Sequence, residues 1–143
     1  MYQEGKFVAV DESLSDEEIF AATRKCIEAW NSLDVEAVLE TYTDDVVYRD
    51  SGTDGTIEGK ERLRRYLTKF MSVWDMQFQV LEDRRIAGAD AQVCIWSVDI
   101  RRRGTDGPTV TQMGIDIIHV RGDQLSRDEA FMDRVAMKAA FGL

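Results

Sequence analysis

Residues 44–66 read DDVVYRDSGTDGTIEGKERLRRY, and the rest of the fold can be worked out from them. Val46 and Tyr48 lie two residues apart, so in an extended chain they share one face while their neighbours take the other. This is the period-two pattern of a β-strand. Asp50 ends this strand and shares the face of Val46 and Tyr48. If that face points inward, a carboxylate enters an apolar site, which is costly unless the site uses or satisfies the charge. The stretch therefore predicts a strand that carries a candidate functional aspartate.

The same stretch continues into a loop and a helix. The loop SGTDGTIEG contains three glycines, which is typical of a turn region. Leu63, Tyr66, Leu67 and Phe70 then recur at helical spacing. Strand, aspartate, loop and helix are therefore expected to form one unit.

Two helices are predicted before this unit. Ser15 and Glu18 lie three residues apart in SDEE and can form a capping box at a helix start. Asp34 is placed to cap a second, short helix after a tight connection. The first helix has an apolar stripe at Ile19, Thr23, Ile27 and Trp30, and the second runs through Val38, Leu39 and Tyr42.

Four long strands are predicted after the unit. They span about residues 76–86, 92–102, 109–120 and 125–133, with turns at AGAD and RGDQ and a closing helical turn in the tail. This order predicts an α+β fold, in which a curved, mostly antiparallel sheet wraps around three N-terminal helices as a cystatin-like cone. The mouth of such a cone is a natural small-molecule pocket.

The strand at residues 92–102 is largely apolar on both faces. A sheet with that pattern is normally covered on both sides, here by its own helices on one face. We expect the other face to be covered by a second subunit, so the sequence predicts a homodimer through the sheet.

Composition limits the class of protein. The chain has 143 residues, which suits one domain at residues 15–143 preceded by an arm at residues 1–14. Its net charge of −9 disfavours nucleic acid or an anionic membrane as a partner. No secretory signal or membrane-spanning stretch is visible, so the cytoplasm is the expected location.

The cysteine and histidine content argues against a zinc site. Cys26 and Cys94 fall inside predicted elements, where a free, buried thiol is commoner than a disulfide. With His119 as the single histidine, a nitrogen or sulfur zinc site is not expected, whereas a carboxylate-only cation site stays open.

Two segments resemble a known superfamily. EAWNSLDVEAVLETYTDDVVYRDSGTDGTIEGKERLRRYL and the later GIDIIHVRGDQLSRDEAFMD resemble the nuclear transport factor 2-like superfamily. Within it they resemble the SnoaL-like polyketide cyclases and the ketosteroid isomerases, over about residues 15–135. This cone hosts enzymes, ligand binders and interaction modules, so the resemblance implies the fold more strongly than a reaction.

The resemblance to ketosteroid isomerases implies roles for two aspartates. Asp50 falls where those enzymes keep the aspartate that moves a proton between carbons, although their VEDP segment reads YRDS here. Asp116 falls where they keep a protonated aspartate that donates a hydrogen bond to the developing oxyanion. Their oxyanion tyrosine corresponds to Cys26, and a thiol is a much poorer donor than a phenol.

A second branch, the limonene epoxide hydrolases, uses an Asp–Arg–Asp group to activate water. Asp99 matches one aspartate of that group, but the arginine position holds Ser97 and the second aspartate position holds Ala130. Epoxide hydrolysis is therefore a minor alternative.

These observations predict a cofactor-independent acid/base enzyme of the isomerase or cyclase type, acting on a small apolar carbonyl compound. The alternative is a non-catalytic module that binds a small ligand or a protein. Asp50 is the predicted base and Asp116 the predicted acid, with Asp99 as a third candidate, whereas His119 is expected to point away from Asp116. The predicted pocket residues are Tyr48, Cys26, Trp30, Tyr66, Gln112 and Trp74.

Overall fold

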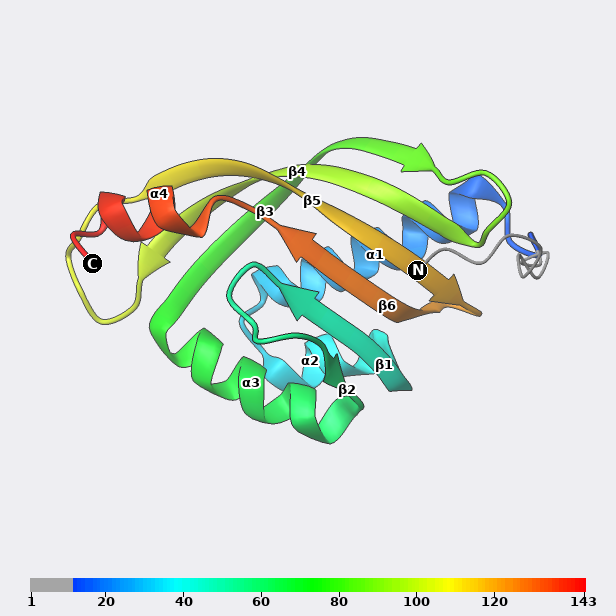
Figure 1. Ribbon diagram of the computed structural model, residues 1–143, viewed down its shortest axis with the longest axis horizontal. Helices are drawn as coiled ribbons and strands as arrows, with labels where there is room; N and C mark the ends of the chain where they lie inside the picture. The colour runs from blue at the N-terminus through cyan, green and yellow to red at the C-terminus, as the bar shows by residue number, and fades with distance from the viewer. Residues whose placement is uncertain (1–11) are drawn as a thin grey trace.

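The computed structural model describes residues 12–143 (Figure 1). Its helices are α1 (Asp16–Asn31), α2 (Val35–Glu40), α3 (Lys60–Val73) and α4 (Arg134–Ala140). Its strands are β1 (Tyr42–Asp50), β2 (Ile57–Glu58), β3 (Trp74–Arg85), β4 (Ala91–Arg102), β5 (Val110–Arg121) and β6 (Gln124–Phe131). The predicted α+β order is confirmed.

Both predicted N-terminal caps are present. The Ser15 side chain accepts a hydrogen bond from the Glu18 backbone N–H, and the Glu18 side chain accepts one from the Ser15 N–H. The Asp34 carboxylate accepts hydrogen bonds from the first N–H groups of α2. These bonds satisfy backbone donors that have no partner within the helix, and so they fix where α1 and α2 begin.

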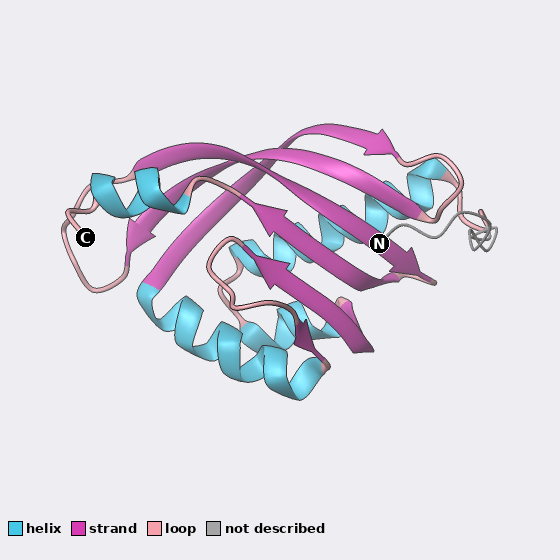
Figure 2. Cartoon of the chain, viewed as in Figure 1, coloured by secondary structure: helices cyan, strands magenta, loops and turns pink. Residues whose placement is uncertain are grey.

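The sheet has the strand order β2-β1-β6-β5-β4-β3. β1 and β6 pair in parallel, and the other neighbouring strands are antiparallel. The sheet is strongly curved, and α1, α2 and α3 lie along its concave side (Figures 1 and 2). The predicted cone is therefore present as a curved, unclosed sheet around three N-terminal helices.

The core lies between the concave face and the helices. The residues of β1 alternate as predicted, with Val46 and Tyr48 buried and Asp50 following on the same face. Ile19 from α1 and Leu63 and Leu67 from α3 are fully buried against this face. This packing places the end of β1 at an inner wall of the cone.

Two boundaries differ from the prediction. Tyr42 begins β1 instead of ending α2, because the backbone N–H of Leu125 bonds to the Thr41 carbonyl and starts the β1–β6 pairing there. The last strand ends at Phe131 rather than Asp133, because the Asp133 side chain caps α4 by accepting a hydrogen bond from Ala136 N–H.

The predicted N-terminal arm falls mostly on residues 1–11, which lie outside the described residues. Its last part contacts the domain. Ser13 Oγ and Leu14 N–H donate hydrogen bonds of 2.7 and 2.9 Å to the Asp90 carboxylate. Among residues 12–143, no helix is long and apolar enough to cross a membrane.

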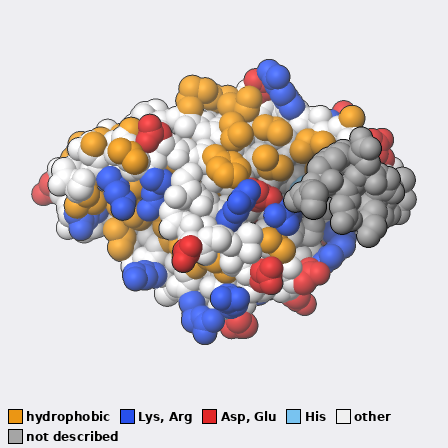
Figure 3. Space-filling model, in the orientation of Figure 1, with side chains coloured by type: hydrophobic (Ala, Val, Ile, Leu, Met, Phe, Trp, Pro, Cys, Tyr) orange, Lys and Arg blue, Asp and Glu red, His pale blue; other side chains and the backbone are white. Residues whose placement is uncertain are grey.

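The convex face of the sheet exposes apolar side chains. Met113 is 64% exposed, and Ile115 and Phe131 are each 36% exposed. Figure 3 shows hydrophobic side chains gathered over β4 and β5. The homodimer through this face stays a prediction.

Candidate active site

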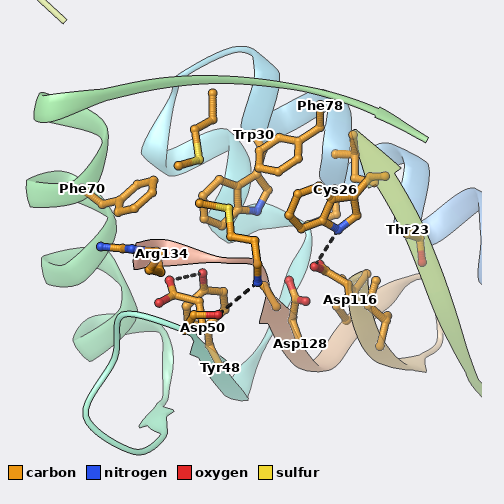
Figure 4. A pocket seen from close by; sticks show the side chains of 18 residues that line it. Thr23, Cys26, Trp30, Tyr48, Asp50, Phe70, Phe78, Asp116, Asp128 and Arg134 are labelled. Carbon is orange, nitrogen blue, oxygen red and sulfur yellow. Dashed lines mark hydrogen bonds between the residues drawn. The ribbon is translucent and has the colours of Figure 1, made fainter. Parts of the chain in front are cut away.

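A cavity opens between the concave face of the sheet, α1, α3 and the start of α4 (Figure 4). It holds about 650 Å³ of space, including the part that opens to solvent. Its wall is mainly apolar, with five aromatic residues, three carboxyl groups, one thiol and one guanidinium. The aromatic residues are Trp30, Tyr48, Phe70, Phe78 and Trp96.

Asp50 lies at one end of the cavity, where β1 ends. Tyr48 Oη donates a 2.8 Å hydrogen bond to Asp50 Oδ2, and Tyr66 Oη donates to the same oxygen. Gly52 N–H donates a 2.7 Å bond to Asp50 Oδ1. Burial, followed by the charge of Asp50, raises the pKa of both tyrosines, so both phenols stay protonated as donors.

Asp116 lies in the middle of β5 and faces the cavity, as predicted. Trp96 Nε1–H donates a 2.9 Å hydrogen bond to Asp116 Oδ1. This indole comes from the neighbouring strand, where Trp96 pairs with Gly114 and Cys94 pairs with Asp116. The bond fixes the orientation of the Asp116 carboxyl group toward the other residues of the wall.

Asp128 is a third cavity carboxyl group, and the sequence reasoning missed it. The residue is only 3% exposed. Tyr42 Oη donates a 2.5 Å hydrogen bond to Asp128 Oδ2, and Trp30 Nε1–H donates a 3.1 Å bond to Tyr42 Oη. Among the described residues Asp128 Oδ1 is buried without a hydrogen-bond partner.

The carboxyl groups of Asp116 and Asp128 are neighbours, and each affects the pKa of the other. Burial raises the pKa of Asp116 well above its ordinary value, and the neighbouring charge of Asp128 raises it further. Burial also raises the pKa of Asp128, while the hydrogen bonds from Asp116 and Tyr42 oppose that rise. These effects favour the neutral form of Asp116, while the bond from Tyr42 favours the charged form of Asp128.

A β-bulge explains why Asp128 was missed. Strict alternation from the buried Leu125 would place Asp128 on the convex face. In the structure Val120 pairs with Leu125 but His119 pairs with Arg127, so one extra residue is inserted in β6. The strand beyond the bulge changes face, and Asp128 turns into the cavity. The sequence carries no clear signal for this bulge.

Cys26 lines the cavity where the resemblance to ketosteroid isomerases implies a tyrosine. Burial raises the pKa of its thiol far above the ordinary value, and the charge of Asp128 adds to the rise. Cys26 and Cys94 are both free and buried. Because the thiolate is the reactive form, Cys26 acts here as a small wall residue and not as a nucleophile.

Tyr48, Trp30 and Tyr66 lie with the carboxyl groups, whereas three other candidates lie elsewhere. Asp99 is exposed on β4 and accepts a 2.6 Å hydrogen bond from Thr111 Oγ1, because alternation turns it to the convex face. The Trp74 ring packs on Phe141 at a centroid distance of 5.1 Å. Neither residue lines the cavity.

Gln112 is also outside the cavity wall. Its side-chain amide lies so that both its nitrogen and its oxygen have a partner. The nitrogen donates to the Asp133 carbonyl at 3.3 Å, and the oxygen accepts from Met137 N–H at 3.2 Å. It therefore connects β5 to α4. His119 lies on the convex side of β5, away from Asp116 as predicted, and burial with the nearby charge of Arg127 lowers its pKa.

Arg134 is the other cavity residue that the sequence reasoning missed. It begins α4, which brings the chain back to the end of the cavity where Asp50 lies. The sequence predicted a helical turn in the tail, but it did not predict that this turn would lie at the cavity. Within residues 12–143, no three His, Cys, Asp or Glu side chains are grouped as metal ligands.

The curved sheet around the three N-terminal helices, with a cavity between them, is the cone that the sequence predicts. Residues 23–127 match the SnoaL-like domain family, and the chain belongs to this family. No curated protein sequence matches the chain significantly.

Solved structures share the fold at low sequence identity. A Bacillus subtilis protein named as a candidate isomerase is 20% identical with a TM-score of 0.79, over 90% of this chain and 96% of that one. A Xanthomonas campestris pv. campestris protein named as a candidate polyketide cyclase is 18% identical with a TM-score of 0.77, over 88% and 98%. An epoxide hydrolase of M. tuberculosis, named as limonene epoxide hydrolase-like, is 16% identical with a TM-score of 0.70, over 87% and 89%.

Proposed function

We propose that this protein is a cofactor-independent acid/base enzyme of the isomerase or cyclase type, which acts on a small, largely apolar carbonyl compound. One observation carries the proposal. Two carboxyl centres with different surroundings, Asp50 and the Asp116–Asp128 pair, face one aromatic cavity. Carboxyl groups held in different protonation states within one site are the usual basis of acid/base catalysis by aspartate.

Asp50 is the proposed base. It accepts hydrogen bonds from Tyr48 and Tyr66, which orient its carboxylate without supplying a positive charge. In this role it takes a proton from the carbon next to the substrate carbonyl. The two phenols then hold the carboxyl group in place until the proton is returned to a second carbon.

The Asp116–Asp128 pair is the proposed electrophile. In this role Asp116, whose neutral form is favoured by burial and by the neighbouring charge of Asp128, offers its proton to the carbonyl oxygen of a bound substrate. The oxygen becomes negative as Asp50 removes the carbon proton, so a neutral acid at this position stabilises the enolate. Trp96 keeps the acid aimed at the cavity.

Hydrogen–deuterium exchange tests this function before the natural substrate is known. A panel of cyclic ketones in D₂O is incubated with the protein, and loss of the proton signal next to the carbonyl is followed by NMR. We expect accelerated exchange for some members of the panel, and a loss of about 10²–10⁴-fold in Asp50→Asn. Asp99→Asn is the matched control, because Asp99 lies outside the cavity and should leave the rate unchanged.

Equal exchange rates in wild type and Asp50→Asn would overturn the proposal and favour the non-catalytic binding module. Epoxide hydrolysis has less support from the geometry. The Asp–Arg–Asp arrangement it would need is not formed, because Asp99 is on the exposed side of β4 while Ala130 lines the cavity.

We also propose that the protein is a homodimer through the convex face of the sheet, located in the cytoplasm. The exposed Met113, Ile115 and Phe131 support the dimer, since a second copy would cover them. Sedimentation at micromolar concentration tests it, and a clean monomer would contradict it.

A further inference from the structure

Arg134 is the one basic side chain among the described residues that line the cavity. Within residues 12–143 it forms no ion pair with a carboxylate at 4 Å or closer, and its Nε is buried without a hydrogen-bond partner. An arginine that lacks a carboxylate partner at a partly buried site is unusual, because burial of an unpaired charge or donor is costly. The site therefore leaves a cation available to something that enters the cavity.

The position of Arg134 is fixed from two sides. A methyl group built on Gly52 would lie 2.6–2.9 Å from the guanidinium atoms, so the glycine leaves room for Arg134 to lie directly against the loop. On the other side Arg134 lies close to Tyr66, where its charge lowers the otherwise raised pKa of the phenol. Figure 4 shows Arg134 at the end of the cavity that holds Asp50.

We propose that Arg134 is a specificity-determining residue, which binds a carboxylate on the substrate and holds the carbon next to the substrate carbonyl beside Asp50. The inference rests on the proposed function and names its substrate class: a carboxylated ring compound that also has a carbonyl group. A guanidinium presents N–H groups in a planar fork that matches the two oxygens of a carboxylate. The aromatic residues of the wall contact the ring, and the carboxylate stays at the end of the cavity where Arg134 lies.

This assignment explains why the cavity combines a cation with three carboxyl groups. Without Arg134, Asp50 and the Asp116–Asp128 pair would repel an anionic substrate. Among the described cavity residues, Arg134 alone offsets that repulsion, and it does so next to Asp50 and not beside the buried pair. An anionic substrate would therefore enter in one orientation.

The experiment compares 2-naphthoate with 2-naphthamide, which differ in charge and little in shape. Binding is measured by ligand-detected NMR and by calorimetry. We expect wild type to bind the naphthoate at least about tenfold more tightly than the amide. Arg134→Gln should remove this preference by weakening naphthoate binding at least about tenfold, with naphthamide binding unchanged.

Two further variants serve as controls. One displaces the guanidinium without removing it, and the other removes a positive charge away from the cavity. Gly52→Ala keeps Arg134 but pushes its guanidinium away, so it should weaken naphthoate binding and spare the amide. The backbone of Gly52 is not in the left-handed region, so alanine introduces no backbone strain there. Arg62→Gln removes an exposed charge on α3 that lies outside the cavity wall, and should change neither affinity.

The proposal is overturned if wild type binds the two probes equally or binds neither, or if both Arg134→Gln and Gly52→Ala keep the preference for naphthoate. Asp50→Asn separates this result from the proposed function. That variant should lose ketone exchange and bind naphthoate as well as wild type or better. Loss of exchange in Asp50→Asn without a naphthoate preference in wild type would support the enzyme and refute the carboxylate site.

Discussion

Asp128 and Glu129 are neighbours on β6, and both are nearly buried, at 3% and 7% exposure. Glu129 lies on the convex face, where its carboxylate pairs with Arg127 and with Arg49 at 2.7 Å. Burial would raise the pKa of Glu129, but the two arginines lower it overall. Asp128 faces the cavity, has Tyr42 and Asp116 as partners, and has a raised pKa. The pKa values of the two carboxyl groups therefore shift in opposite directions because their partners differ, and not because their burial differs.

The two faces of the sheet therefore differ in how their carboxyl groups are satisfied. A carboxylate between two arginines is satisfied, and it needs no other explanation. A carboxyl pair with a raised pKa in an aromatic cavity reduces the stability of the fold at neutral pH. Groups of this kind are concentrated at functional sites, because acid/base catalysis needs shifted pKa values.

The largest expected effect comes from disturbing the packing of the inner face at Gly114. A methyl group there would lie 2.2 Å from the Trp96 ring and 2.7 Å from the Phe131 carbonyl oxygen. Gly114→Ala should therefore lower the free energy of unfolding by about 3 kcal/mol, measured by urea denaturation. Val135→Ala is the control at a position on α4 that is 80% exposed, with an expected change within about 0.5 kcal/mol. Equal costs in the two variants would show that the inner face is not tightly packed.

The next effect is the pH dependence that Asp116 imposes. Its pKa is raised in the folded protein, so above the unfolded value of about 3.9 the folded state keeps a proton that the unfolded state releases. Stability then falls by up to about 1.4 kcal/mol per pH unit until the folded pKa is reached. Asp116→Asn removes this loss and keeps an acceptor for Trp96. It should be more stable than wild type at neutral pH, and the gain should vanish as the pH approaches about 4.

Urea denaturation of both proteins between about pH 4 and about pH 8 checks this prediction. A constant difference across that range would mean that Asp116 titrates alike in the folded and unfolded states. A proton kept by Asp116 in the folded protein, as the proposed mechanism requires, would then be ruled out.

A smaller change tests the pair itself. Asp128→Asn replaces the carboxylate that accepts the proton of Asp116 by a neutral amide that can donate to it. The pKa of Asp116 should fall by about one unit or more, since a like charge is removed from contact. Carbon-13 NMR of the aspartate carboxyl groups measures the shift. An unchanged Asp116 titration would mean that burial alone raises its pKa.

Local patterns were sufficient to predict most of the fold. The capping box at Ser15, the cap at Asp34 and the alternation of β1 depend on residues close together in sequence, and all three are present. The same alternation turned Asp50 and Asp116 toward the cavity. These features follow from side-chain period and hydrogen-bonding capacity, which a sequence records directly.

The cavity residues that the sequence did not predict are placed by tertiary contacts, which a local sequence pattern does not record. Asp128 reaches the cavity through a bulge in the β5–β6 pairing, and Arg134 reaches it because α4 folds back over the loop at Gly52. Asp99 was selected from a resemblance to another branch, although alternation with Trp96 on β4 turns it to the exposed face. Strand pairing and chain return are tertiary properties, so residues placed by them need the structure.

The smallest expected effect is on the convex face. Glu129 has a lowered pKa, so its contribution to stability is present above the unfolded value of about 4.3 and is lost as the pH falls through the folded pKa. Arg49 and Arg127 remain 44% and 40% exposed, so solvent weakens both pairs. Glu129→Gln should therefore cost no more than about 1 kcal/mol at neutral pH, and less in acid, by urea denaturation.

The sign is what makes this variant informative. Replacing the acid with a raised pKa at Asp116 on the inner face should stabilise the protein, whereas removing the charge of Glu129 from the convex face should destabilise it. Both effects should shrink as the pH falls toward the carboxyl range. If Glu129→Gln instead stabilises the protein at neutral pH, its arginine partners do not compensate for its burial. The convex face would then carry an unsatisfied acid as well, and a raised carboxyl pKa could no longer distinguish the catalytic face of this sheet from the structural one.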